Sequence, residues 1–152
     1  IGVEGSASKV LKKKSLTSME WKSVEAFLKQ REAFAMKLFA ELNSVIFGSR
    51  LPPLPLVWRQ MKNCAGIYHG KDSSITLSKT LLTSSARLTS TLAHEMAHAA
   101  AHLLDERPND GHGAVWQKWA RIGHARYPTI VTGSVYHNYC SANPNPNEEN
   151  QA

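Results

Sequence analysis

Long apolar runs and closely spaced cysteines are both missing from this chain of 152 residues. No apolar stretch approaches the roughly 20 residues that a membrane-spanning helix needs, so we expect no membrane partner. The two cysteines, Cys64 and Cys140, form no CxxC pair, which excludes a zinc ribbon within this sequence and a disulfide-rich scaffold. The N-terminal stretch is polar and basic and lacks a signal-peptide pattern. Because the chain begins at Ile1 rather than methionine, we expect it to be a fragment of a longer protein.

Acidic residues are outnumbered in the sequence. The 12 Asp and Glu residues stand against 18 Lys and Arg residues, which gives a net charge of +6 and a pI of about 9.5. This surplus favours an anionic partner, of which nucleic acid is the commonest, although a merely soluble basic surface explains the charge equally well. The hydrophobic fraction of 42% is sufficient for one domain with its own core.

Composition divides the chain into three parts. Residues 1–16 are basic and polar and predict a disordered arm. Residues 17–140 carry the apolar patterning of a domain, and residues 141–152 form a polar linker or tail rich in Pro and Asn. Within the domain, TSME at 17–20 matches a capping box and predicts the start of a long helix, which Gly48 ends.

A small sheet and two further helices are expected after this first helix. Three short strand-like runs, LVWRQ, CAGIYH and SITLS, are joined by short links and predict an antiparallel sheet with SITLS at its edge. Thr83, Ser84 or Ser85 can cap the next helix, which runs to about Leu104, and a third helix is expected at about 114–126. The fold class is therefore α+β, with helices packed on a small antiparallel three-stranded sheet.

The stretch HEMAH at 94–98 predicts a metal site. Residues four apart on a helix point the same way, so His94 and His98 can place two imidazole nitrogens on one ion. Glu95 lies about 100° round the helix from His94. That offset keeps it off the ion but near enough to take a proton from a water there. The helix has no Lys or Arg between Thr89 and Glu106, and buried histidines on such a helix need partners. This context favours a metal over histidines that are merely satisfied in the core.

A catalytic zinc site needs a third protein ligand. His102 is too far along the helix, about 12 Å from His94 at 1.5 Å per residue. Leu104 stands where the metzincin pattern requires histidine. His112 is the best candidate, because the glycines of DGHG let the backbone turn tightly beside a metal. Other possible third ligands are the loop carboxylates Asp105, Glu106 and Asp110. His124 and His137 are weaker alternatives, for which structural roles are favoured.

The segment TLAHEMAHAAAHLLDERPNDGHGAVWQKWA resembles the active-site segment of the SprT-like family, and CAGIYHGKDSSITLSKTLL is similar to the strands that precede it. The resemblance covers roughly residues 20–139 and is nearest to the Spartan and germ cell nuclear acidic protein branches. It implies a zincin-like zinc metalloprotease that cleaves proteins crosslinked to DNA, with DNA as activator, in the nucleus on chromatin. It also implies that His94, His98 and His112 bind Zn²⁺ and that Glu95 is the catalytic base.

The end of the sequence departs from the family's pattern. Members of the germ cell branch often continue from an H-x-Y segment, similar to HNY at 137–139, into a cysteine-rich zinc ribbon, whereas this chain continues into SANPNPNEENQA. Two rival functions stay open. One is a zinc-stabilised module that binds DNA or chromatin without cutting, and the other is a metallopeptidase unrelated to DNA. The glutamate at position 95 favours the protease, because a structural site needs no base there.

Further candidate residues concern the substrate and DNA. An edge strand at Ser74–Ser78 is expected to hold an extended substrate by strand addition. The expected partners are DNA-crosslinked proteins and single-stranded or junction DNA, and the chain is expected to be a monomer. Candidates to stabilise the oxyanion are Tyr136, His137 and Tyr139. Candidate DNA-binding residues are Lys12, Lys13, Lys14, Arg59, Lys62, Lys118, Arg121 and Arg126. Aromatics that would stack on unpaired bases, if exposed, are Trp58, Tyr68 and Tyr136.

Overall fold

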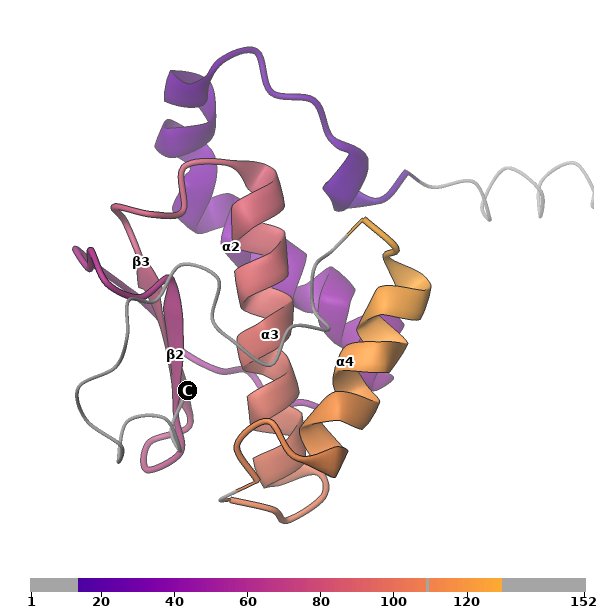
Figure 1. Ribbon diagram of the computed structural model, residues 1–152. Coiled ribbons are helices and arrows are strands. Elements are labelled where there is room, and N and C mark those ends of the chain that lie inside the picture. The colour runs from indigo at the N-terminus through magenta and orange to yellow at the C-terminus, as the bar shows by residue number, and fades with distance from the viewer. Residues whose placement is uncertain (1–13, 109, 130–152) are drawn as a thin grey trace, which may run out of the picture.

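The computed structural model describes residues 14–108 and 110–129 (Figure 1). Its elements follow the chain in the order η1 (Leu16–Ser18), α2 (Val24–Phe47), β1 (Leu56–Arg59), β2 (Gly66–His69), β3 (Ser74–Ser78), α3 (Ser85–Leu103) and α4 (Ala114–Arg126). The α+β fold class is confirmed. Most of the basic arm expected at 1–16 and the whole polar tail expected at 141–152 lie outside the described residues. None of the described helices is long and apolar enough to cross a membrane.

The first long helix begins later than its capping box predicted. Leu16–Ser18 form a short 3-10 helix, and α2 begins at Val24 after Ser23, whose hydroxyl accepts a hydrogen bond from the Ala26 amide at 3.1 Å. Ser23 is the effective cap because its hydroxyl group is the one that accepts from an amide of the first turn of α2, so the prediction at 17–20 is wrong. The predicted end is confirmed, since Gly48 closes α2 in a left-handed conformation.

The three strands form a mixed sheet in the order β1-β3-β2. β1 pairs with β3 in parallel, and β2 pairs with β3 antiparallel. The prediction of an antiparallel sheet with Ser74–Ser78 at its edge is therefore wrong on both points. The physical reason is visible in β3, all five residues of which are buried, as expected for a central strand. Within the part of the chain that the structure describes, β1 and β2 are the outer strands of the sheet.

Helix α3 lies at the centre of the molecule, with β2 on one side and α4 on the other, and it also contacts α2 (Figure 1). Ser84 caps it by accepting from the Arg87 amide at 3.2 Å, which confirms one of the three predicted caps. From Leu92 to Ala101 every residue is buried, as the absence of charge predicted. The core therefore surrounds the segment that carries HEMAH, and α4 begins and ends where the sequence placed it.

Candidate metal centre

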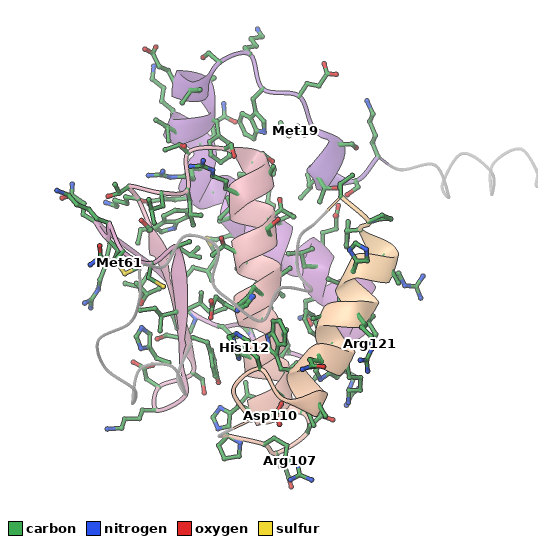
Figure 2. The ribbon with its side chains drawn as sticks, in the orientation of Figure 1. Met19, Met61, Arg107, Asp110, His112 and Arg121 are labelled. Carbon is green, nitrogen blue, oxygen red and sulfur yellow. The ribbon has the colours of Figure 1, made fainter. Side chains whose placement is uncertain are left out.

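Three histidines converge on the side of α3 that faces α4. His94 and His98 come from adjacent turns of α3 and are each 7% exposed, and His112 comes from the loop before α4. Their ring nitrogens lie within 4.8 Å of one another, and this is the cluster that can hold a metal within residues 14–108 and 110–129. Figure 2 shows His112 beside the lower half of α3. The sequence-based choice of His112 over the loop carboxylates thus matches the observed grouping.

The spacing of the three Nε2 atoms suits a tetrahedral ion. Nε2 of His94 lies 3.3 Å from Nε2 of His98 and 3.1 Å from Nε2 of His112. Metal–nitrogen bonds of about 2.0–2.1 Å at tetrahedral angles separate two ligand nitrogens by about 3.3 Å. Three neutral imidazoles also form the donor set that borderline metals such as zinc prefer. The residues present therefore fit a divalent transition metal bound by these three nitrogens.

The loop DGHG places His112 through its neighbours. The Asp110 carboxylate accepts a hydrogen bond from the Trp116 amide at 2.9 Å, so it caps the start of α4 in place of the N-cap residue Gly113. A Cβ on Gly113 would lie 2.7 Å from Oδ1 of Asp110, which only glycine avoids. Gly111 turns the chain with a φ of +58°. Asp110 is thus a helix cap rather than a metal ligand. By capping α4 it also fixes the position of His112 in the loop.

Trp116 forms one wall of the centre, a role that sequence reasoning missed. It is 0% exposed, and its indole N–H donates to the His94 carbonyl oxygen at 3.3 Å. Its ring stacks on His98 at 5.5 Å and meets His112 edge-on at 4.6 Å between centroids. A signal was present in the sequence, because Trp116 lies four residues, about one helical turn, after His112.

Glu95 lies on the side of α3 that faces β2. The side chain is 0% exposed, and its Oε2 accepts a hydrogen bond from the Tyr68 amide of β2 at 2.9 Å. Burial raises the pKa of Glu95 to about 8, and the Tyr68 amide opposes this by stabilising the ionised form. A cation bound at the histidines would lower this pKa further. The result is a carboxyl group that can exchange a proton near neutral pH.

The other candidate ligands have different partners. Asp105 accepts from Lys118 at 2.9 Å and from the Trp119 indole at 2.6 Å. Burial raises the pKa of Asp105, but these donors outweigh it and leave the pKa below its usual value. Glu106 and His124 are exposed and lie outside the histidine cluster. His137 lies outside the described residues, as do the oxyanion candidates Tyr136 and Tyr139.

The candidate DNA-binding residues that the structure describes are scattered over its surface. Lys14, Arg59, Lys62, Lys118, Arg121 and Arg126 are exposed, whereas Lys12 and Lys13 lie outside the described residues. Arg121 is on the outer side of α4 (Figure 2). Lys118 is paired with Asp105 and lies 4.7 Å from the centre of the Trp119 ring. Tyr68 is only 4% exposed, so it does not offer a face for base stacking.

A model of the SprT-like family matches residues 35–137, which include the three histidines, Glu95 and the sheet. The chain belongs to the SprT-like family. This family is a metalloprotease-type domain, and the three histidines of this member are close enough to bind a metal. The resemblance drawn from HEMAH and DGHG is thereby confirmed.

Relatives of this SprT-like domain include much longer proteins. Germ cell nuclear acidic protein of Drosophila melanogaster is 33% identical over 122 residues, which are 76% of this chain and 12% of that protein. Germ cell nuclear acidic-1 protein of Caenorhabditis elegans is 30% identical over 99 residues, or 61% of this chain and 18% of that protein. The human germ cell nuclear acidic protein is 39% identical over 56 residues, or 37% and 8%. The chain thus spans less than a fifth of each of these relatives, and no solved structure matches it.

Proposed function

We propose that this SprT-like domain is a zinc-dependent endopeptidase, activated by DNA, that cleaves proteins crosslinked to DNA. The observation that supports the protease most strongly is the pairing of a three-histidine centre with a fully buried glutamate one residue after the first ligand. A site that only stabilises the fold gains nothing from burying a carboxyl group there, because that burial costs free energy. A general base accounts for it.

The chemistry divides between the metal and Glu95. When bound, zinc supplies a Lewis acid that polarises a carbonyl group and lowers the pKa of water. Glu95 takes the proton from the attacking water and returns it to the leaving amine. Burial favours the protonated form of Glu95, which helps the group to hold this proton between the two steps. The Tyr68 amide keeps Oε2 of Glu95 oriented throughout.

The edge strand for an extended substrate is β2 rather than Ser74–Ser78. β2 is an outer strand of the sheet and contacts α3, whereas Ser74–Ser78 lies between two partners. Strand addition needs an unpaired edge. We therefore place the substrate along the edge of β2 at Gly66–His69, apart from the Tyr68 amide, which already donates to Glu95.

The proposed partner of the basic surface is single-stranded or junction DNA, and the proposed setting is nuclear chromatin, with the domain acting as a monomer. The net charge of +6 and the exposed cations support this assignment. Lys118 is the weakest candidate, because its ammonium group is already paired with Asp105. Lys14, Arg59, Lys62, Arg121 and Arg126 are the better ones.

The protease is tested with a protein covalently attached to a single-stranded oligonucleotide. Wild type should cleave it when metal and DNA are present, and Glu95→Gln should cleave roughly 10²- to 10⁴-fold more slowly because proton transfer is lost. Metal content and thermal stability of the variant serve as controls. Cleavage that is equally fast without DNA would point to a DNA-independent peptidase, and DNA binding with no cleavage to a binding module.

DNA contact is tested by titrating labelled oligonucleotides at several salt concentrations. Neutralising Lys62, Arg121 and Arg126 should weaken binding and flatten its salt dependence, because fewer counterions are released. The matched control neutralises Lys22, Lys29 and Lys37, three exposed lysines at or near α2. Equal losses in both triple variants would mean that net charge alone, rather than contacts made by Lys62, Arg121 and Arg126, attracts DNA.

A further inference from the structure

His102 is the third histidine on the metal-bearing helix, and it has no place among the metal ligands. It lies eight residues beyond His94, and the structure leaves it outside the histidine cluster. Its Nδ1 instead shares a hydrogen bond of 2.8 Å with the hydroxyl group of Tyr68 on β2. The two rings meet edge-on with centroids 5.8 Å apart. His102 thus connects the C-terminal part of α3 to the sheet.

Tyr68 connects to the same helix a second time, through its backbone. Its amide N–H donates to Oε2 of Glu95 at 2.9 Å. Among residues 14–108 and 110–129, β2 pairs with β3 alone, and the Tyr68 amide points away from β3 and donates to α3. The residue that donates to the proposed base is therefore also the residue whose side chain is anchored by His102.

At the other end of the strand, Gly66 lies close to α3. A Cβ at this position would lie 2.7 Å from Cγ2 of Thr91 and 3.2 Å from Cγ of Glu95. β2 thus approaches α3 closely near Thr91, one turn before Glu95, and is bonded to it again at His102, about two turns after. Glu95 sits between these two attachments. Displacing either one would shift the Tyr68 amide relative to the carboxylate.

We propose that Tyr68 and His102 are positioning residues, which hold β2 against α3 so that the Tyr68 amide fixes the orientation of Glu95. The inference rests on the proposed function for its effect on catalysis, but the hydrogen bonds themselves are independent of it. A carboxylate held at one oxygen presents the other in a constant direction, and proton transfer depends on that direction. Losing the anchor should therefore lower kcat while KM changes little.

Two variants remove the anchor with little change of shape. Tyr68→Phe deletes only the hydroxyl group, and His102→Leu deletes the ring nitrogens. His102→Asn is the conservative variant, because its side-chain amide can occupy the position of Nδ1. The matched control is Tyr127→Phe, which deletes a buried tyrosine hydroxyl with a hydrogen bond of 2.9 Å to Glu41, a residue of α2 outside the metal centre.

The first measurement is hydrogen exchange of the Tyr68 amide by NMR, which needs no enzymatic activity. We expect exchange roughly 3- to 10-fold faster in Tyr68→Phe and His102→Leu, the range that one hydrogen bond supplies. The Ile75 amide, bonded to the Pro55 carbonyl at 2.9 Å, is the internal reference. Tyr127→Phe should leave the Tyr68 amide unchanged, and His102→Asn should restore its protection.

The second measurement is the steady-state cleavage of the crosslinked substrate. Tyr68→Phe and His102→Leu should each lower kcat roughly 3- to 10-fold, with no further loss in the double variant, because they break the same link. Unchanged amide exchange, or kcat losses equal to that of Tyr127→Phe, would overturn the inference. A wild-type protein that cuts nothing would refute the proposed protease and leave the exchange result to decide the positioning role.

Discussion

Two glutamates on the two long helices, Glu41 and Glu95, differ in how their carboxyl groups are buried and hydrogen-bonded. Glu41 of α2 is half-buried and accepts from three donors: the Ser15 hydroxyl at 2.7 Å, the Leu16 amide at 2.8 Å and the Tyr127 hydroxyl at 2.9 Å. Glu95 of α3 is 0% exposed, and its Oε2 accepts a hydrogen bond from the Tyr68 amide at 2.9 Å. We call the first group, Ser15, Leu16, Glu41 and Tyr127, the staple.

The difference separates a structural carboxylate from a reactive one. The three donors of the staple stabilise the negative charge of Glu41 and join the start of the domain, α2 and the end of α4. Burial raises the pKa of Tyr127, and the neighbouring Glu41 adds to the effect, so its proton stays on the hydroxyl and in the hydrogen bond. Glu95 is instead fully buried, and this burial raises the pKa of its carboxyl group, which makes its proton easier to exchange near neutral pH.

Removing a metal ligand should give the largest difference between the two regions. In His112→Ala, metal affinity should fall more than about 100-fold, because even the loss of a group that only supports a ligand costs 10- to 100-fold. Competition with a chromogenic chelator measures it. His124→Ala, on the exposed side of α4, and Glu41→Gln should both bind metal as wild type does. Full affinity in His112→Ala would remove this residue from the centre.

The pH dependence of the metal-free protein should distinguish the two glutamates next. Glu95 has a pKa of about 8 when folded against 4.5 as the ordinary value. The folded protein therefore holds a proton that the unfolded chain has lost, and stability falls as pH rises between these values, by up to about 1.4 kcal/mol per unit. Glu95→Gln should lack this loss, so its advantage over wild type should grow up to about pH 8 and then level off. A constant difference across urea titrations at pH 5 to 9 would contradict it.

The close approach of β2 to α3 predicts a third effect. Gly66→Ala should destabilise the domain by about 1–3 kcal/mol, because the new Cβ would overlap Cγ2 of Thr91. Adding Thr91→Ser removes that methyl group and should recover most of the loss. Gly70→Ala is the control, since its nearest neighbours are ordinary contacts at 3.7 Å. If Gly70→Ala costs as much as Gly66→Ala in thermal unfolding, strand flexibility rather than the contact is responsible.

Features set by local spacing could be predicted from the sequence, and features set by pairing could not. His94 and His98 share a face of α3 because they are four residues apart, and α4 begins at Ala114, directly after the glycine that follows His112. The order of the strands depends on contacts between residues far apart in the sequence. The short links between the strand-like runs predict hairpins with Ser74–Ser78 at an edge, whereas β3 is the central strand. The same limit applied at residues 17–20, where a valid local pattern competed with Ser23.

The contacts around Glu95 show the limit most clearly. Tyr68 precedes Glu95 by 27 residues, and no periodicity in the sequence connects them. The donor is a backbone amide, which any residue except proline provides, so the residue type at position 68 does not predict this hydrogen bond. Trp116 contacts all three histidines because α4 packs on α3, and its spacing from His112 in the sequence does not by itself predict those contacts.

Substitutions in the staple should give the smallest effect, a modest loss of stability with no change in metal affinity. Tyr127→Phe should lower the free energy of unfolding by about 0.5–1.5 kcal/mol, the contribution of one hydrogen bond, and Glu41→Gln by somewhat more because it alters all three. Both should retain wild-type metal affinity and cleavage, because the staple lies apart from Glu95 and the histidines. Chemical denaturation and chelator competition on the same samples provide the two readouts. A loss of metal affinity in Tyr127→Phe would show that α4 transmits strain from the staple to His112, and the two carboxylates would then belong to one coupled unit.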